Sequence, residues 1–145
     1  MIEVIIMAYY ECLINNDYIN IGDKFTVTLT GSHNVTTTAT VCYISKTEIC
    51  LLGDTSLGNA IWSTACSYAW NYTVNINGKE YTGVCKIPTL EQIYSKCAGY
   101  RRDFNYWTST SYDSRGSWCV YSGGYVYGYG FGNSLSTLPF IEIAL

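Results

Sequence analysis

Cysteine is the reactive residue type that stands out in this chain of 145 residues. Seven cysteines occur beside a single histidine. A zinc site needs cysteines or histidines in closely spaced pairs such as CxxC, and the sequence contains no such pair. We therefore predict no metal site and no cofactor. We expect buried, reduced thiols that pack as small apolar side chains, with disulfides formed after release from the cell as the alternative. The cysteines are Cys12, Cys42, Cys50, Cys66, Cys85, Cys97 and Cys119.

Catalysis by a nucleophile requires a base within its reach. His33 is in the sequence GSHN, which is typical of a turn, so we expect its imidazole to face water. Asp103 and Asp113 flank the sequence YWTST, and loop aspartates commonly accept hydrogen bonds from backbone N–H groups. We predict no catalytic residue and expect that the protein is not an enzyme.

The sequence GGYVYGYGFGN, residues 123–133, alternates aromatic residues with small ones. This alternation predicts a strand with its aromatic side chains on one face. Tyrosine offers a large contact area, a hydroxyl for polar partners and few rotamers to fix, as in antibody loops. We predict that an aromatic surface binds a ligand or partner; packing of the same rings against the protein's own core is the alternative. The predicted binding residues are Tyr112, Tyr121, Tyr125, Tyr127, Tyr129, Phe131 and Asn133.

A second contact is expected on the opposite face of this strand, where glycines leave room for another backbone of the same chain or of a neighbouring subunit. The N-terminal sequence MIEVIIMAYY is apolar and is predicted to dock on a partner chain. We expect a homo-oligomer, either a dimer or a trimer. The predicted contacts are Ile2, Val4, Ile5, Ile6, Gly128 and Gly130.

Charge and hydropathy limit the partners. Eight Lys and Arg against eleven Asp and Glu give a formal net charge of −3, without a basic stripe to neutralise phosphates, so nucleic acid is not expected as a partner. The apolar run at the N-terminus is interrupted by Glu3 and is far shorter than a membrane span. We predict no signal peptide, no membrane insertion, and synthesis in a cytoplasm.

Period-two alternation predicts that most elements are strands. Residues 18–45 alternate on both sides of GSHN, which predicts a hairpin, and Asn77-Gly78 predicts a second hairpin because both residues tolerate positive φ. Trp107 and Trp118 have apolar neighbours and are expected in the core. A short helix or irregular loop is expected at 56–72, and strands are expected at 48–53, 105–112, 117–122, 124–131 and 138–145.

One main helix is expected at about 86–98. Pro88 suits its first turn, Thr89 can cap it, and Gly99 ends it. At this length we expect a single domain over residues 1–145. Its predicted parts are a docking strand or tail at 1–10, a β-rich N-terminal half at 11–85, and a C-terminal half at 86–145 with the helix and a sheet.

Four motifs in order resemble a family of poorly characterised domains from gut bacteria and their phages. They are IPTLEQI, NYWTSTSY, SWCVYSGGYVYGYGFGNS and LPFIEIAL, which lie between Ile87 and Leu145. The resemblance implies an α+β, C-type-lectin-like fold with a twisted antiparallel sheet, one main helix at about 86–98 and long loops. It also implies a virion component, because phage members of the family resemble fibre, decoration or receptor-binding proteins.

From this resemblance we expect a non-enzymatic structural protein of a phage virion, in the head, tail, fibre or decoration. It would be made in the cytoplasm of the host bacterium, assemble with itself and other virion proteins, and attach to a host surface glycan or protein. A bacterial surface or secreted ligand-binding domain is the alternative. The chain departs from the pattern at Leu138-Pro139, where the family has Arg-Pro, and it lacks the tripeptides of calcium-dependent sugar binding. Cys119 stands alone where formylglycine-generating relatives would need a reactive pair.

Overall fold

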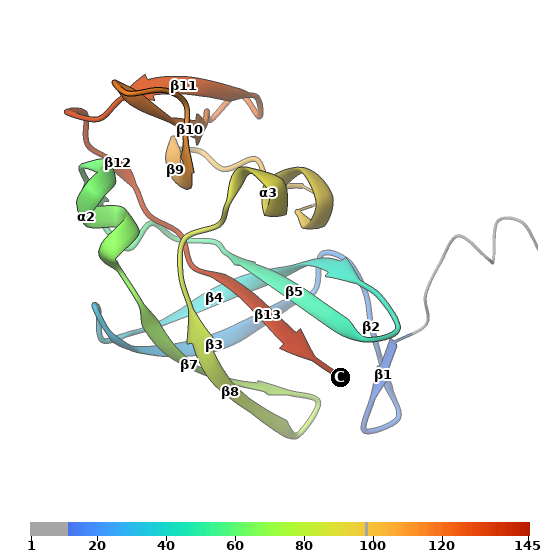
Figure 1. Ribbon diagram of the computed structural model, residues 1–145. Helices are drawn as coiled ribbons and strands as arrows, with labels where there is room; N and C mark the ends of the chain where they lie inside the picture. Colours follow the sequence, from blue (N-terminus) through green and yellow to red (C-terminus); the bar gives the residue numbers. More distant parts are fainter. Residues whose placement is uncertain (1–11, 98) are drawn as a thin grey trace, which may run out of the picture.

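Strands make up most of the structure. The computed structural model describes residues 12–97 and 99–145 (Figure 1), and 53% of these residues are in strands against 10% in helices. The strands are β1 (Cys12–Ile14), β2 (Asp17–Ile19), β3 (Lys24–Gly31), β4 (Val35–Ile44), β5 (Glu48–Gly53), β6 (Asn59–Ala60), β7 (Trp70–Ile76), β8 (Lys79–Cys85), β9 (Tyr106–Ser111), β10 (Gly116–Val120), β11 (Val126–Gly130), β12 (Leu135–Ser136) and β13 (Phe140–Ala144). The helices of the described chain are α2 (Trp62–Ser67) and α3 (Leu90–Lys96).

Six strands form a nearly closed antiparallel barrel in the order β13-β5-β4-β3-β7-β8. β3, β4 and β5 follow one another as hairpins, and β7 pairs with both β3 and β8. β13 returns from the C-terminal part of the chain to pair with β5. Within the described residues, a single bridge between Lys86 and Phe140 joins β8 to β13 and closes the barrel at that point.

Alternate apolar residues of these strands fill the barrel. In β3, Val27 and Leu29 are buried while Thr28 between them is exposed, as the period of a half-buried strand requires. Burial of many large apolar side chains is the main contribution to the stability of such a core. The barrel interior includes Val27, Leu29, Val41, Ile49, Leu51, Trp70, Val74, Ile76, Ile141 and Ile143.

A second sheet, which we call the cap sheet, covers one end of the barrel. Its order is β11-β10-β9-β12-β6, and it is made from two insertions between barrel strands, residues 54–69 and 86–139. Figure 1 shows it above the barrel together with α2 and α3. Trp107 of β9 is fully buried in the same apolar cluster as the barrel strands, so the two sheets share a core and the prediction for this tryptophan is confirmed.

A short hairpin of β1 and β2 covers the opposite end of the barrel (Figure 1). Asn15 Nδ2 donates to the carbonyl of Asn77 (2.9 Å) in the β7–β8 turn, and Asn77 Nδ2 donates to the carbonyl of Ile14 (3.3 Å). Cys12, Ile14 and Ile19 are buried in the barrel cluster. The hairpin therefore plugs the end of the barrel that the cap sheet leaves open.

The α+β, C-type-lectin-like fold expected from the motif resemblance is wrong. The described chain is mainly β, with a barrel-like sheet and two short helices in place of one main helix. The helix expected at about 86–98 is limited to α3, because Lys86 pairs with Phe140 and Thr89 caps the first turn. The Thr89 side chain accepts from the Gln92 N–H (3.0 Å), and the Gln92 side chain accepts from the Thr89 N–H (2.9 Å), which is a capping box.

Most local predictions are confirmed. The hairpins around GSHN and Asn77-Gly78, the strand at 48–53, the short helix within 56–72 and the strands predicted after residue 105 are all present. The strand predicted at 138–145 is β13, and it pairs with β5 of the barrel rather than with the cap sheet. The barrel therefore contains strands from both predicted halves of the chain, residues 11–85 and residues 86–145.

Candidate functional site: an aromatic surface on the cap sheet

The outermost strands of the cap sheet carry the predicted aromatic row. β10 and β11 are antiparallel neighbours, with Trp118 opposite Gly128. Because side chains alternate between the two faces of a strand, Tyr125, Tyr127 and Tyr129 share one face and Gly128 lies on the other. The row therefore has two faces that have to be considered separately.

On the first face, three tyrosines gather around Tyr121. Its ring centroid lies 5.2 Å from those of Tyr125 and Tyr127 and 6.2 Å from that of Tyr129. Tyr125 and Tyr127 are more than half exposed. Edge-to-face contacts of this kind are favourable for aromatic rings. The rings thus hold one another in place while two of them stay open to a partner.

The far end of the row packs inward. Tyr129 is half-buried against the core, with its ring centroid 6.3 Å from that of Trp107. Phe131 stacks on Trp62 of α2 at 4.8 Å between centroids. Asn133 folds back on its own loop, where its Nδ2 donates to the Gly130 carbonyl (3.2 Å). The row is thus exposed at its start and packed at its end.

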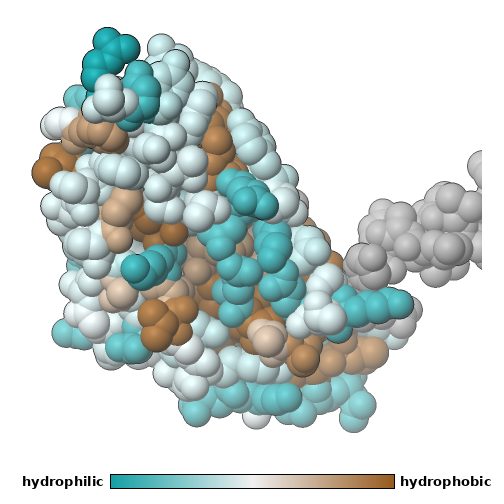
Figure 2. Space-filling model, in the orientation of Figure 1, coloured by the Kyte–Doolittle hydropathy of each residue, from teal (hydrophilic) through white to brown (hydrophobic). Residues whose placement is uncertain are grey.

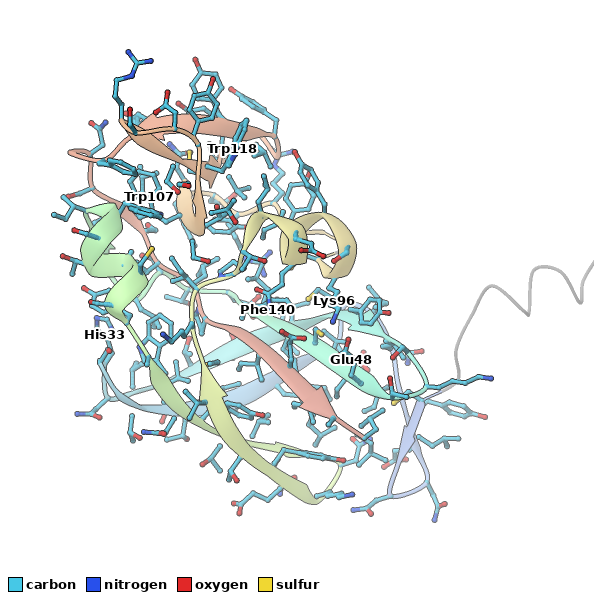
Figure 3. All side chains as sticks on the ribbon, viewed as in Figure 1. His33, Glu48, Lys96, Trp107, Trp118 and Phe140 are labelled. Atoms are coloured by element: carbon cyan, nitrogen blue, oxygen red, sulfur yellow. The ribbon has the colours of Figure 1, made fainter. Side chains whose placement is uncertain are left out.

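The second face forms a shallow hollow. Tyr112, directly after β9, is 53% exposed and meets Trp118 edge to face with ring centroids 4.6 Å apart. Figure 3 shows Trp118 on the cap sheet. The hollow has a volume of about 270 Å³, and we call it the aromatic hollow. Its lining is Tyr112, Trp118, Val126, Tyr127 and Gly128.

Gly128 allows Tyr112 to lie close to the sheet. A Cβ at position 128 would be 2.8 Å from Cδ2 of Tyr112, so a larger residue would push the ring outward. The close neighbour of this glycine is therefore an aromatic ring of the same chain, a pairing that shields glycine in sheets. That Gly128 and Gly130 contact a second copy of the chain stays a prediction. The other predicted oligomer contacts, Ile2, Val4, Ile5 and Ile6, lie outside the described residues.

A charged pair lies beside the aromatic hollow. Arg115 Nη2 is 3.3 Å from Asp113 Oδ2, and the Arg115 backbone N–H donates to Asp113 (2.7 Å). This backbone hydrogen bond is the main cause of a lowered pKa of Asp113, so its carboxylate is charged at neutral pH. A neighbouring depression of about 170 Å³ joins the pair to Tyr112 and Tyr129. An aromatic floor with polar groups at its edge suits a ligand that has flat apolar faces and hydroxyl groups.

Arg115 was not predicted as a site residue, and Trp118 was predicted to lie in the core. Trp118 is only half-buried, so that prediction is wrong. Alternation was the available signal, because Ser117 and Cys119 on either side of it are buried and the tryptophan must face the other way. Its indole therefore belongs to the aromatic hollow.

The residues considered for chemistry have structural partners. His33 is half-buried, not facing water as expected, and its Nδ1 accepts a hydrogen bond from Nε1 of Trp70 (3.0 Å). The edge of its ring meets Tyr68 at 4.7 Å between centroids. This aromatic contact packs the β3–β4 turn against the start of β7.

All seven cysteines stand as free thiols, and six of them are buried. Burial raises the pKa of Cys85 to about 12 and that of Cys119 to about 11. A thiol with so high a pKa forms almost no nucleophilic thiolate at neutral pH. Cys66 is half-buried, and burial also raises its pKa.

One cluster has the residue types of a metal site. Ligand atoms of Glu48, Cys50 and Glu142 lie within 4.8 Å of one another. The Nζ of Lys96 is 2.5 Å from Glu48 and 3.2 Å from Glu142, and Figure 3 shows this side chain reaching toward Glu48. Hydrogen bonds to the two carboxylates raise the pKa of Lys96, so the position between them is held by an ammonium group that fastens α3 to the barrel.

Comparison with family models, curated protein sequences and solved structures finds no match to this chain. Neither helix of the described residues has the length and apolar character needed to cross a membrane. The geometry of the aromatic surface therefore carries the functional argument.

Proposed function

We propose that the protein is a non-enzymatic structural module of a phage virion, in a head, tail, fibre or decoration protein, that binds the host surface and associates with copies of itself. The aromatic surface of the cap sheet supports the binding part of this proposal. The order of the four motifs between Ile87 and Leu145 supports the virion part.

One observation carries the binding function: three tyrosines on neighbouring segments of one sheet are more than half exposed. They are Tyr112, Tyr125 and Tyr127. Tyr125 and Tyr127 are on one face of the sheet and Tyr112 is on the other, so both faces present exposed aromatic side chains, which are typical of interaction sites. Tyr127 is in β11, Tyr125 directly precedes this strand and Tyr112 directly follows β9. Each ring contacts a neighbouring aromatic ring, so little conformational entropy is lost when a partner binds.

A glycan of the host surface is the ligand class that suits the aromatic hollow best. The apolar face of a sugar ring can lie on Tyr112 and Trp118, and its hydroxyl groups can bond to the charged Asp113–Arg115 pair. The hollow is shallow and open, which fits a saccharide unit within a longer polymer better than a small ligand that has to be enclosed.

Binding to an array of bacterial surface polysaccharides tests this role. Tyr112→Ala removes one wall of the hollow and is expected to weaken binding by about tenfold, as truncation of a central aromatic contact commonly does. Tyr94→Ala is the matched control, because Tyr94 is 66% exposed but lies on α3. Equal binding by the wild type and Tyr112→Ala, or an equal loss in Tyr94→Ala, would contradict the proposal.

The virion part needs a separate measurement. Mass spectrometry of purified phage particles is expected to detect peptides of this chain in fixed proportion to other particle proteins. Particles without these peptides would refute the virion assignment, whatever the result on the polysaccharide array.

A further inference from the structure

The barrel has an open seam between β8 and β13. Beyond the bridge of Lys86 with Phe140 the strands diverge, as Figure 1 shows, and no further pairing joins them within the described residues. Tyr72 covers part of this seam from β7. A Cβ at Gly83 would lie 2.7 Å from its ring, and its hydroxyl donates to the Glu142 carbonyl (3.4 Å).

Backbone groups of β8 point into the seam. In a two-residue hairpin such as the one at Asn77-Gly78, the closing residues are hydrogen-bonded to each other, so the odd-numbered residues of β8 bond to β7. The carbonyl of Lys86 faces the other way, because it accepts from the Phe140 N–H (2.9 Å). By the same alternation, three residues of β8 direct their N–H and C=O into the seam without a partner in the described chain. They are Glu80, Thr82 and Val84.

A groove of about 410 Å³ lies at the narrow end of the seam. Val84 forms an apolar part of its wall and is 67% exposed. Figure 2 shows hydrophobic residues among hydrophilic ones on this face of the molecule. An unpaired strand edge beside a groove is the arrangement that receives an added strand, because the edge bonds the backbone and the groove takes side chains. The lining includes Val84, Lys86, Thr89, Gln92, Phe140 and Glu142.

We propose that β8 of one copy receives residues 2–10 of a second copy as an added antiparallel strand. The segment has the β-branched composition of a strand, and its nine residues are enough to pair along the seven residues of β8. After Glu3, its residues 4–10 form an unbroken apolar run, which suits a strand covered on both faces. This inference rests on the self-association in the proposed function and names the two surfaces that make it.

The course of β1 favours a second copy over the same chain. β1 runs toward the β7–β8 turn, where Asn15 contacts Asn77, so Cys12 is at the end of β1 away from that turn. A chain that enters β1 at Cys12 would have to reverse its direction to reach its own β8. The β8 edge of a neighbouring copy can be reached without this reversal.

Substitutions on both sides of the contact test the inference in the full chain. Val84→Pro removes an N–H that points into the seam, and proline is tolerated on a strand edge when its N–H faces away from the ladder. Val84→Thr keeps this N–H and is its control. Ile5→Pro disrupts the donated strand, and Ile5→Val is its control. Light scattering gives the mass in solution, and hydrogen exchange reports on the amides of Glu80 and Thr82.

We expect a wild-type mass of at least twice the 16.2 kDa of one chain, and protected amides at Glu80 and Thr82. Both proline variants should associate at least about tenfold more weakly and lose this protection, while both controls behave as the wild type. Circular dichroism identifies a Val84→Pro chain that does not fold, in which case Ile5→Pro decides. A monomer with a protected Thr82 amide, unprotected amides in the wild type, or assembly that survives Ile5→Pro would each overturn the proposal.

The result is separable from the binding function. Val84 is in the barrel and the aromatic hollow is on the cap sheet, so monomeric Val84→Pro is expected to retain binding of each single site to polysaccharide. Loss of assembly with binding retained supports the strand exchange. Tyr112→Ala is expected to lose polysaccharide binding but to keep its assembly. That result would test the binding role of the aromatic hollow and would leave the strand exchange unaffected.

Discussion

Replacement of Gly83 by alanine tests how Tyr72 helps to close the barrel. Gly83 is not among the glycines with positive φ, so its backbone accepts alanine, and a smaller unfolded-state entropy would by itself stabilise the protein by about 0.4–1 kcal/mol. The new Cβ would however lie 2.7 Å from Cε2 and from the hydroxyl oxygen of Tyr72. Real Cβ contacts are not this short, so the ring has to move.

The ring has little room to move. Tyr72 is 6% exposed, packs in the barrel cluster and donates to the Glu142 carbonyl. Overpacking of a filled core costs about 1–3 kcal/mol, and loss of the hydrogen bond adds about 1 kcal/mol. With the entropic gain subtracted, the free energy of unfolding should fall by about 1–3.5 kcal/mol, which lowers the Tm by about 3–12 °C for a chain of this size.

Urea unfolding followed by tryptophan fluorescence measures the effect in a double-mutant cycle. Tyr72→Leu removes the ring, so alanine at position 83 should be neutral or stabilising in that background, with a coupling energy of about 2–4 kcal/mol. Gly132→Ala is the control, because a Cβ there meets nothing within 4 Å and φ is not positive. It should stabilise by about 0.4–1 kcal/mol.

If Gly83→Ala is as stable as Gly132→Ala, the Tyr72 ring does not restrict position 83. The same conclusion follows if Gly83→Ala destabilises the protein equally with and without this ring. In either case the ring would not be what restricts position 83, and the seam would be held by the Lys86–Phe140 bridge alone among the described residues.

Three further predictions concern single sites. Burial alone would raise the pKa of Asp54, but hydrogen bonds from Thr40, Thr38 and Lys24 outweigh it and lower the pKa. The stabilisation by the Asp54 carboxylate is therefore present above the unfolded pKa of about 3.9 and is lost as the pH falls through the folded pKa. In urea unfolding, Asp54→Asn should be less stable than the wild type at pH 7 but not near pH 2. Equal stability of the two proteins at pH 7 would contradict this. Thr89→Ala removes the capping box of α3 and should lower the free energy of unfolding, measured in urea, by about 1 kcal/mol. Thr89→Ser keeps the hydroxyl and should not lower it. Similar losses in both variants would exclude capping as the cause. Titration with a thiol-reactive disulfide reagent should modify one thiol, that of Cys66, rapidly in the native protein. After denaturation without reductant, all seven thiols should react. Fewer than seven reactive thiols would mean that disulfides are present and would favour an exported protein.

Much of the barrel could be predicted from local sequence. Val27 and Leu29 alternate with threonines in β3, and Asn77-Gly78 forms a two-residue turn between β7 and β8. The hairpins β3–β4 and β7–β8 therefore follow from interactions between residues close in the sequence. The helix after Pro88 was predictable for the same reason, because Thr89 caps it and Gln92 completes the capping box. These elements depend on residues only a few positions apart.

The arrangement of the sheets could not be predicted in the same way. β13 has the alternation of any strand, and nothing near Phe140 in the sequence specifies Leu52 as its partner. The aromatic row was predicted as one surface, but Phe131 stacks on Trp62 and Tyr129 packs near Trp107. The exposed rings differ from the packed ones because of contacts that α2 and β9 bring from elsewhere in the chain.

The position of β13 also has a consequence for the rate of folding. Phe140 pairs with Leu52, and more than half of the chain lies between them, including the whole C-terminal insertion of the cap sheet. Pairing across such sequence separations has a high loop-closure entropy and is slow. The hairpins β3–β4 and β7–β8 can form early, but the edge of β5 stays unpaired until the cap sheet has brought β13 to it, and β8 then gains only the bridge of Lys86 with Phe140. Folding intermediates should therefore expose two sheet edges and be prone to aggregation at high concentration.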